Sequence, residues 1–89
     1  MSQVLTKPLS GSQIRAARAL VRWSAQDLAR HSTVSLRTIR RAELSEERTA
    51  MTLANNLSVR RALQSAGVEF IDENGGGAGV RLRKPNRET

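Results

Sequence analysis

Three serines mark the starts of three short helices in the first half of the chain. Ser10 is followed three residues later by Gln13, and Ser24 by Asp27, which is the spacing at which two side chains cap a helix start reciprocally. Ser35 is placed to cap a third helix. Because successive caps lie close together in the sequence, only a few residues join one helix to the next. The pattern predicts a mainly helical fold built from short helices.

Apolar residues at helical spacing follow the first cap and recur later in the chain. After the first cap they are Ile14, Ala17, Leu20 and Val21. In the later segment they are Val59, Ala62, Leu63 and Ala66. The first helix should end near Arg22, and Gly67 supplies the left-handed stop typical of the end of the later helix. Thr52 or Asn55 could each cap that helix, and residues 45–48 could form an additional turn, so we expect four or five helices.

The pattern changes from helical to β after Gly67. Two short β-like runs, at residues 68–71 and 80–83, flank an Asn74-Gly75 turn signal in a glycine-rich stretch, which predicts a β-hairpin over residues 68–84. A lone two-stranded ribbon is marginal in water, so its apolar face should rest on the helices or on a second copy of the chain. We favour the second copy. The residues expected at this dimer interface are Val68, Phe70, Val80 and Leu82.

Positive charge dominates the sequence of 89 residues. Fifteen Lys and Arg stand against eight Asp and Glu, which gives a formal charge of +7. A polyanion is therefore the expected partner, and arginine offers a planar fork suited to phosphates and guanine edges. Charge alone does not separate DNA from RNA or an anionic membrane, and a solubilising surface is the plain alternative.

Length and composition limit the other possibilities. A chain this short closes one modest core, which we place at residues 10–67, with a flexible arm at residues 1–9 and a frayed tail at residues 85–89. The absence of cysteine excludes disulfides and thiolate metal sites, and no apolar run approaches the roughly 20 residues that span a bilayer. We expect a cytoplasmic, nucleoid-associated protein without a cofactor, a metal, a membrane partner or an evident small-molecule ligand.

Residues 25–44 carry the most informative arrangement, two short helices around a tight turn. The expected buried positions are Leu28, Ala29, Val34, Ile39 and Ala42. The small Ala29 lets the two helices cross closely, so that the second helix, at about residues 36–43, projects from the surface and fits the major groove. Between Arg30 and Arg41 there are four arginines and no acid. The exposed face of the projecting helix carries Leu36, Arg37, Arg40 and Arg41.

These residues resemble the lambda-repressor-like, or xenobiotic-response-element type, helix-turn-helix regulators of bacteria and phages. The resemblance covers most of residues 10–84 and includes features of a bacterial subgroup of short members. The motifs that carry it are Arg15-Ala16-Ala17-Arg18-Ala19-Leu20, Trp23-Ser24, Leu28-Ala29, Val34-Ser35, Thr38-Ile39, Glu43, Arg60-Arg61-Ala62-Leu63, Ala66-Gly67-Val68-Glu69-Phe70 and Gly75-Gly76-Gly77. The fold it implies is a lambda-repressor-like helix-turn-helix domain with a short C-terminal β-hairpin.

The resemblance also implies the roles of single residues. It places Leu36, Arg37 and Arg41 opposite base edges, and it pairs Arg18 with Glu43 in a structural ion bridge without DNA contact. The residues expected nearer the DNA backbone are Ser35, Thr38, Arg40 and Arg22. Related regulators bind inverted half-sites as two-fold dimers, so we expect a homodimer on double-stranded DNA. Both a repressor and an activator are compatible with this expectation.

Four residues depart from the family pattern. Leu36 stands where many relatives have a polar residue that contacts bases, and Ala25 stands where relatives often have a glutamine that contacts a phosphate, so that phosphate contact is not assigned. Thr33 stands at the turn position usually filled by glycine, where a positive φ is costly for a β-branched residue, so the turn is either altered or strained. Arg22 replaces the usual Gly or Asn at the end of the first helix, where its side chain could reach a phosphate.

Other function classes remain as alternatives. The main one is an antitoxin or anti-activator, which keeps the fold but mainly grips another protein. Sequence-specific RNA modules usually display aromatic platforms, whereas Trp23 and Phe70 are the only aromatic residues here apart from the lone His31. An enzyme is the least expected class, because no paired carboxylates, nucleophile with base, or metal-ligand cluster is recognisable.

Overall fold

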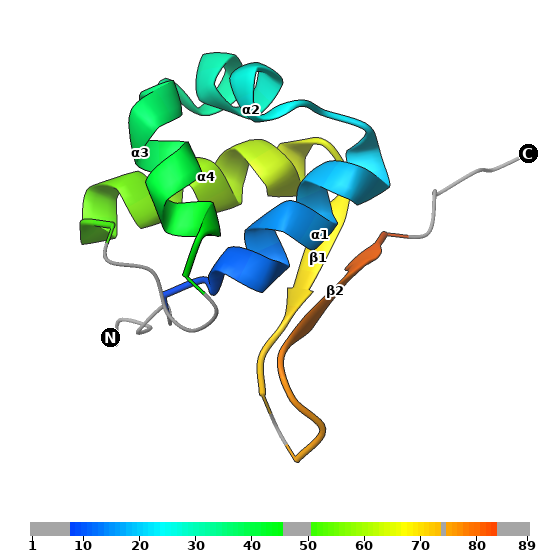
Figure 1. Cartoon of the computed structure of the whole chain (residues 1–89). Helices are drawn as coiled ribbons and strands as arrows, with labels where there is room; N and C mark the ends of the chain where they lie inside the picture. The colour runs from blue at the N-terminus through cyan, green and yellow to red at the C-terminus, as the bar shows by residue number, and fades with distance from the viewer. Residues whose placement is uncertain (1–7, 46–50, 74, 84–89) are drawn as a thin grey trace, which may run out of the picture.

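The computed structural model describes residues 8–45, 51–73 and 75–83. Within them the chain is mainly helical, with one antiparallel β-hairpin, as the sequence predicts (Figure 1). The elements are α1 (Gly11–Val21), α2 (Ala25–Ser32), α3 (Leu36–Glu43), α4 (Leu53–Ser65), β1 (Val68–Ile71) and β2 (Gly79–Leu82). None of these helices has the length and apolar character needed to cross a bilayer. The possible turn at residues 45–48 and the tail at 85–89 fall largely or wholly outside the described residues.

The expected caps are confirmed. Ser10 Oγ accepts from the Gln13 N–H at 3.0 Å, and Gln13 Oε1 accepts from the Ser10 N–H at 3.1 Å. Ser24 and Asp27 form the same reciprocal pair at 3.0 and 2.9 Å, and the Ser24 N–H holds the pKa of the Asp27 carboxyl below its ordinary value. Ser35 caps α3. These local hydrogen bonds satisfy backbone donors that a helix start leaves unpaired.

Thr52, and not Asn55, caps α4. The Thr52 hydroxyl accepts from the Asn55 N–H at 3.1 Å, so α4 begins at the earlier of the two expected positions. At the other end, Gly67 has a φ of 110°, as expected of a residue that ends a helix and turns the chain into a strand.

Arg22 and Thr33 both adopt the left-handed conformation. Arg22 ends α1 at a φ of 60°, and Thr33 ends α2 at a φ of 61°. A side chain with a Cβ atom pays about 1–2 kcal/mol for this conformation. The turn between α2 and α3 therefore keeps the geometry that a glycine would adopt, and of the two expectations for Thr33 the strained turn is the one observed.

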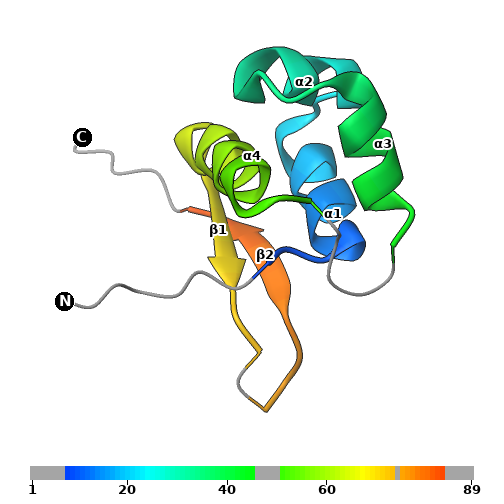
Figure 2. The same cartoon turned by 90° about the vertical axis from the view of Figure 1, so that its left-hand side faces the viewer.

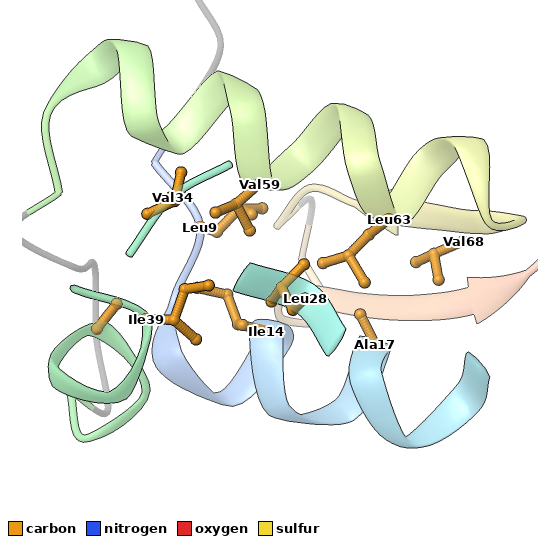
Figure 3. Packing of buried hydrophobic residues seen from close by; sticks show 10 residues of the cluster. Leu9, Ile14, Ala17, Leu28, Val34, Ile39, Val59, Leu63 and Val68 are labelled. Carbon is orange, nitrogen blue, oxygen red and sulfur yellow. The ribbon is translucent and has the colours of Figure 1, made fainter. Parts of the chain in front are cut away.

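A single hydrophobic core joins all six elements (Figure 3). The labelled buried side chains are Leu9, Ile14, Ala17, Leu28, Val34, Ile39, Val59, Leu63 and Val68. The helical faces predicted from apolar spacing supply most of them. Ala29, expected where α2 and α3 cross, is half-buried and packs against this core.

Leu9 corrects the expected boundary of the N-terminal arm. Its side chain is fully buried in the core, and its N–H donates to Asn56 Oδ1 at 2.9 Å. Asn56 is itself only 2% exposed, so this bond crosses the interior between α4 and the segment before α1. The arm was expected to include Leu9 because a single apolar residue beside Pro8 shows no periodicity. Residues 1–7 lie outside the described residues.

The start of α1 packs against the end of α3. A Cβ atom on Gly11 would lie 2.0 Å from the Ser45 carbonyl oxygen and 2.7 Å from that of Ala42, so only glycine fits without a shift of backbone. One turn further along α1, the Arg15 guanidinium donates to the Glu43 carbonyl oxygen. These contacts fix the position of the C-terminal end of α3 relative to α1.

The ribbon packs on α1 and α4 and then extends beyond the helices (Figure 2). Val68 pairs with Leu82 and Phe70 with Val80, so the four residues of the expected apolar face lie opposite one another. A hydrogen bond of 3.1 Å from Gln13 Nε2 to the Gly79 carbonyl ties the start of β2 to α1. The hairpin is therefore part of the globule and not a detached arm.

Candidate nucleic-acid interface

Helix α3 lies at the periphery of the molecule, with α1 between it and the ribbon (Figures 1 and 2). One side of α3 is buried through Ile39, Ala42 and Glu43. The opposite side carries Arg37, Arg40 and Arg41, which are all exposed. At about 100° per residue, three arginines at these positions fall within one arc of the helix surface.

The three arginines of this arc have no acidic partner in the part of the chain that the structure describes. Arg30, at the end of α2, differs because its guanidinium contacts Asp27 Oδ1 at 2.7 Å. Both side chains of that pair are solvent-accessible, so it constrains Arg30 only weakly. The arc of α3 therefore presents positive charge that no described carboxylate offsets.

The start of α3 adds two hydroxyl groups and an apolar side chain. Ser35 Oγ accepts from the Thr38 N–H at 3.1 Å and donates to Thr38 Oγ1 at 2.9 Å. This arrangement leaves the hydroxyl proton of Thr38 available to an outside acceptor such as a phosphate oxygen. Leu36 is half-buried next to the turn. The expected readers and backbone contacts of α3 thus lie on one continuous surface.

Shallow depressions of the surface lie on more than one side of α3, and two of them border its first residues and the start of α4. One, of about 320 Å³, lies toward the start of α4 and is lined by Thr38, Arg41 and Asn55 among others. The other, of about 510 Å³, lies over the turn and is lined by residues of α2 and by the first residues of α3. A peripheral helix with an exposed face of this kind is an element that a DNA major groove can admit.

Arg18 and Glu43 form the ion pair expected between α1 and α3. Arg18 Nε lies 2.6 Å from Glu43 Oε2, and a second bond of 2.9 Å joins Arg18 Nη2 to Glu43 Oε1. Arg18 Nη1 also donates to the Trp23 carbonyl at 2.9 Å. The bond to Glu43 raises the pKa of Arg18, and partial burial opposes that rise. With side chains only 21% and 10% exposed, the pair acts as a structural clamp.

Arg22 and His31 lie outside the α3 surface. Arg22 is exposed at the end of α1, and its contact with a DNA backbone stays a prediction. The His31 ring stacks on Trp23 with centroids 4.2 Å apart and an angle of 4° between the planes. The sequence does not predict this stack, because no spacing rule pairs a residue before a helix, such as Trp23, with one two turns into it, such as His31.

Val68 was expected at a dimer interface, and the structure corrects this. Of the other three residues expected there, one remains largely exposed. Val68 is fully buried in the core of its own chain and offers no surface to a second copy. Phe70 and Val80 are half-buried, and the Arg60 guanidinium covers the Phe70 ring at 5.0 Å. Leu82, at 49% exposed, is the member of the expected set that remains open. The apolar face rests mainly on the helices because α1 and α4 reach it.

No protein-family model matches the chain, and a comparison with curated proteins finds no match either. The functional assignment therefore depends on the geometry and charge of the α2–α3 pair.

Proposed function

We propose that this protein is a sequence-specific DNA-binding transcriptional regulator, in which α2, the turn and α3 act as a helix-turn-helix of the lambda-repressor-like kind. The observation that carries the proposal is the exposed arc of Arg37, Arg40 and Arg41 on a helix at the periphery of the molecule. An arc of this kind is suited to a duplex because the major groove admits one α-helix with its side chains.

Each residue of the arc has a role in the proposal. Arg37 and Arg41 donate to guanine O6 and N7, an interaction worth about 1–3 kcal/mol of discrimination for a good bidentate pair. Leu36 contacts bases through its apolar side chain. The contacts to the DNA backbone come from Ser35, Thr38, Arg40 and Arg22. Backbone contacts set the position of the helix, and base contacts set its sequence preference.

The proposed assembly is a homodimer on two half-sites. One recognition helix covers only a few base pairs, and each mismatch costs only about 1–3 kcal/mol, so a second subunit is needed for useful specificity. The half-sites of such dimers lie about one helical turn of DNA apart. In this proposal the ribbon supplies the interface, through the exposed side chain of Leu82 and through its outer strand edges, because unpaired strand edges readily pair with another strand.

Salt-dependent binding to duplex DNA tests the function. DNA fragments selected by the purified protein are titrated at several salt concentrations, and the affinity should fall steeply with salt because phosphate contacts release counterions. Arg37→Ala should relax the preference at one base position. Arg40→Ala should weaken binding to all sequences and reduce the salt slope by about 1. Arg61→Ala, which removes an exposed arginine from α4, is the control and should change neither.

The outcome against the proposal is equally clear. Identical effects of Arg37→Ala and Arg40→Ala would contradict their separate roles. Absence of salt-dependent DNA binding in the folded protein would contradict the function itself.

A further inference from the structure

A hollow lies over the turn between α2 and α3, and its walls differ in character. We call it the elbow hollow; it has a volume of about 510 Å³ and includes Gln26, Ala29, Arg30, Val34, Ser35 and Leu36 in its lining. The side chains of Ala29, Val34 and Leu36 make part of the lining apolar. Leu36 in this lining directly precedes Arg37 of the arc, so a duplex that lies along the arc would reach the edge of the hollow.

Most polar side chains of the elbow hollow already have partners. Ser35 bonds to Thr38, the Thr33 hydroxyl donates to the Ser32 carbonyl, and Arg30 contacts Asp27. The Gln26 carboxamide is exposed and has no hydrogen-bond partner within the described residues. A carboxamide carries two donors and an acceptor on one planar group. Gln26 is therefore the side chain of this hollow with a complete set of groups free for recognition.

We propose that Gln26 and Leu36 together recognise one A·T base pair. In the major groove adenine presents N7 as an acceptor and N6 as a donor, which a glutamine carboxamide matches with two bonds. The thymine of the same pair presents its C5-methyl group in the same groove, where an apolar side chain can contact it. The Gln26 carboxamide thus matches the adenine edge of the base pair, and the Leu36 side chain matches the methyl group of the thymine. This inference rests on the proposed function and adds a base-pair preference to it.

An apolar lining favours a base edge over a phosphate in this hollow. A phosphate would gain nothing from Leu36, Val34 and Ala29, and its oxygens would lose hydration against them. A thymine methyl group is stabilised by the same contacts, because burying one carbon of apolar surface is worth about 0.8 kcal/mol. The phosphates are contacted instead by Arg40 of the α3 arc and by the hydroxyl groups of Ser35 and Thr38.

Two single-atom changes in the DNA test the inference. In a duplex selected by the wild-type protein, deoxyuridine replaces each thymine in turn, which removes only the methyl group. At one position this should weaken wild-type binding about fourfold and should leave the binding of Leu36→Ala unchanged. At the adenine of the same pair, 7-deazaadenine should weaken wild-type binding about fivefold or more and should leave the binding of Gln26→Ala unchanged.

Gln64→Ala is the matched control, because it removes a carboxamide from α4 and should keep both sensitivities. The inference is overturned if no A·T pair shows both sensitivities, or if the effect of Gln26→Ala disappears instead when a neutral methylphosphonate replaces one phosphate. In either case Arg37→Ala still relaxes a guanine preference if the proposed function holds. Loss of that effect as well, with no DNA binding by folded wild-type protein, overturns both.

Discussion

Replacing Gly11 with alanine should lower the free energy of unfolding by about 2–3 kcal/mol. The added Cβ atom would lie 2.0 Å from the Ser45 carbonyl oxygen and 2.7 Å from the Ala42 carbonyl oxygen. Both neighbours are backbone atoms, which cannot turn aside as a long side chain can, so α1 and the end of α3 must separate. Alanine is a better helix former than glycine, and the cost should appear in spite of that preference.

Urea denaturation followed by circular dichroism measures this effect. Gly76→Ala is the control, because a Cβ atom there meets no other atom within 4 Å, and its stability should match the wild type within about 0.5 kcal/mol. Under the proposed function, Gly11→Ala should also weaken DNA binding, since the displaced end of α3 carries Arg41. A Gly11→Ala variant as stable as the wild type would show that α1 and α3 do not meet as closely as described.

Removing the carboxylate of Glu43 should have an effect of similar or larger size. Glu43→Ala leaves the Arg18 guanidinium partly buried and without its charged partner. Loss of one partner typically costs about 3–5 kcal/mol for a buried pair. The upper part of that range requires full burial, and Arg18 is 21% exposed, so we expect a value near 3 kcal/mol. Thermal and urea unfolding both report it.

The exposed pair of Glu69 and Arg81 provides the comparison. Their contact is 2.8 Å long, close to that of the buried pair, but the side chains are 38% and 69% exposed. Glu69→Ala should therefore cost no more than about 1 kcal/mol. If Glu43→Ala and Glu69→Ala left the melting temperature equally unchanged, burial of the first pair would have no energetic meaning and the clamp between α1 and α3 would be refuted.

Local signals made much of the fold predictable. Ser10, Ser24 and Ser35 cap helices by contacts within three residues, which a sequence displays directly. The strands after Gly67 follow from a composition change and a turn signal of the same short range. These signals can be interpreted without knowing the tertiary structure, and the helices and strands that they predict are the ones observed.

Long-range contacts account for what the sequence did not reveal. The bond from Leu9 to Asn56 joins residues 47 positions apart, and the need for glycine at position 11 arises from carbonyl groups at the far end of α3. Val68 was expected to contact a second copy, because the apolar pattern of a strand does not show whether helices of the same chain cover it. Each of these facts depends on how elements pack, which residue spacing does not encode.

The candidate site was only partly predictable for the same reason. The exposed arc of Arg37, Arg40 and Arg41 follows from helical periodicity alone. Gln26 belongs to the neighbouring helix, and it lines the same hollow as Leu36 only because α2 and α3 cross there. No local pattern distinguishes Gln26, since at this point of the chain only the adjacent Ala25 departs from the family pattern.

The central claim is that the exposed face of α3 contacts duplex DNA. The most direct test is a titration of the ¹⁵N-labelled protein with a selected duplex, in which nuclear magnetic resonance follows each backbone amide. The largest shifts should fall on residues 35–41 and on Gln26, and amides of the ribbon facing away from α3 should move little. Shifts concentrated on the ribbon or on the middle of α4, with residues 35–41 unmoved, would contradict the account.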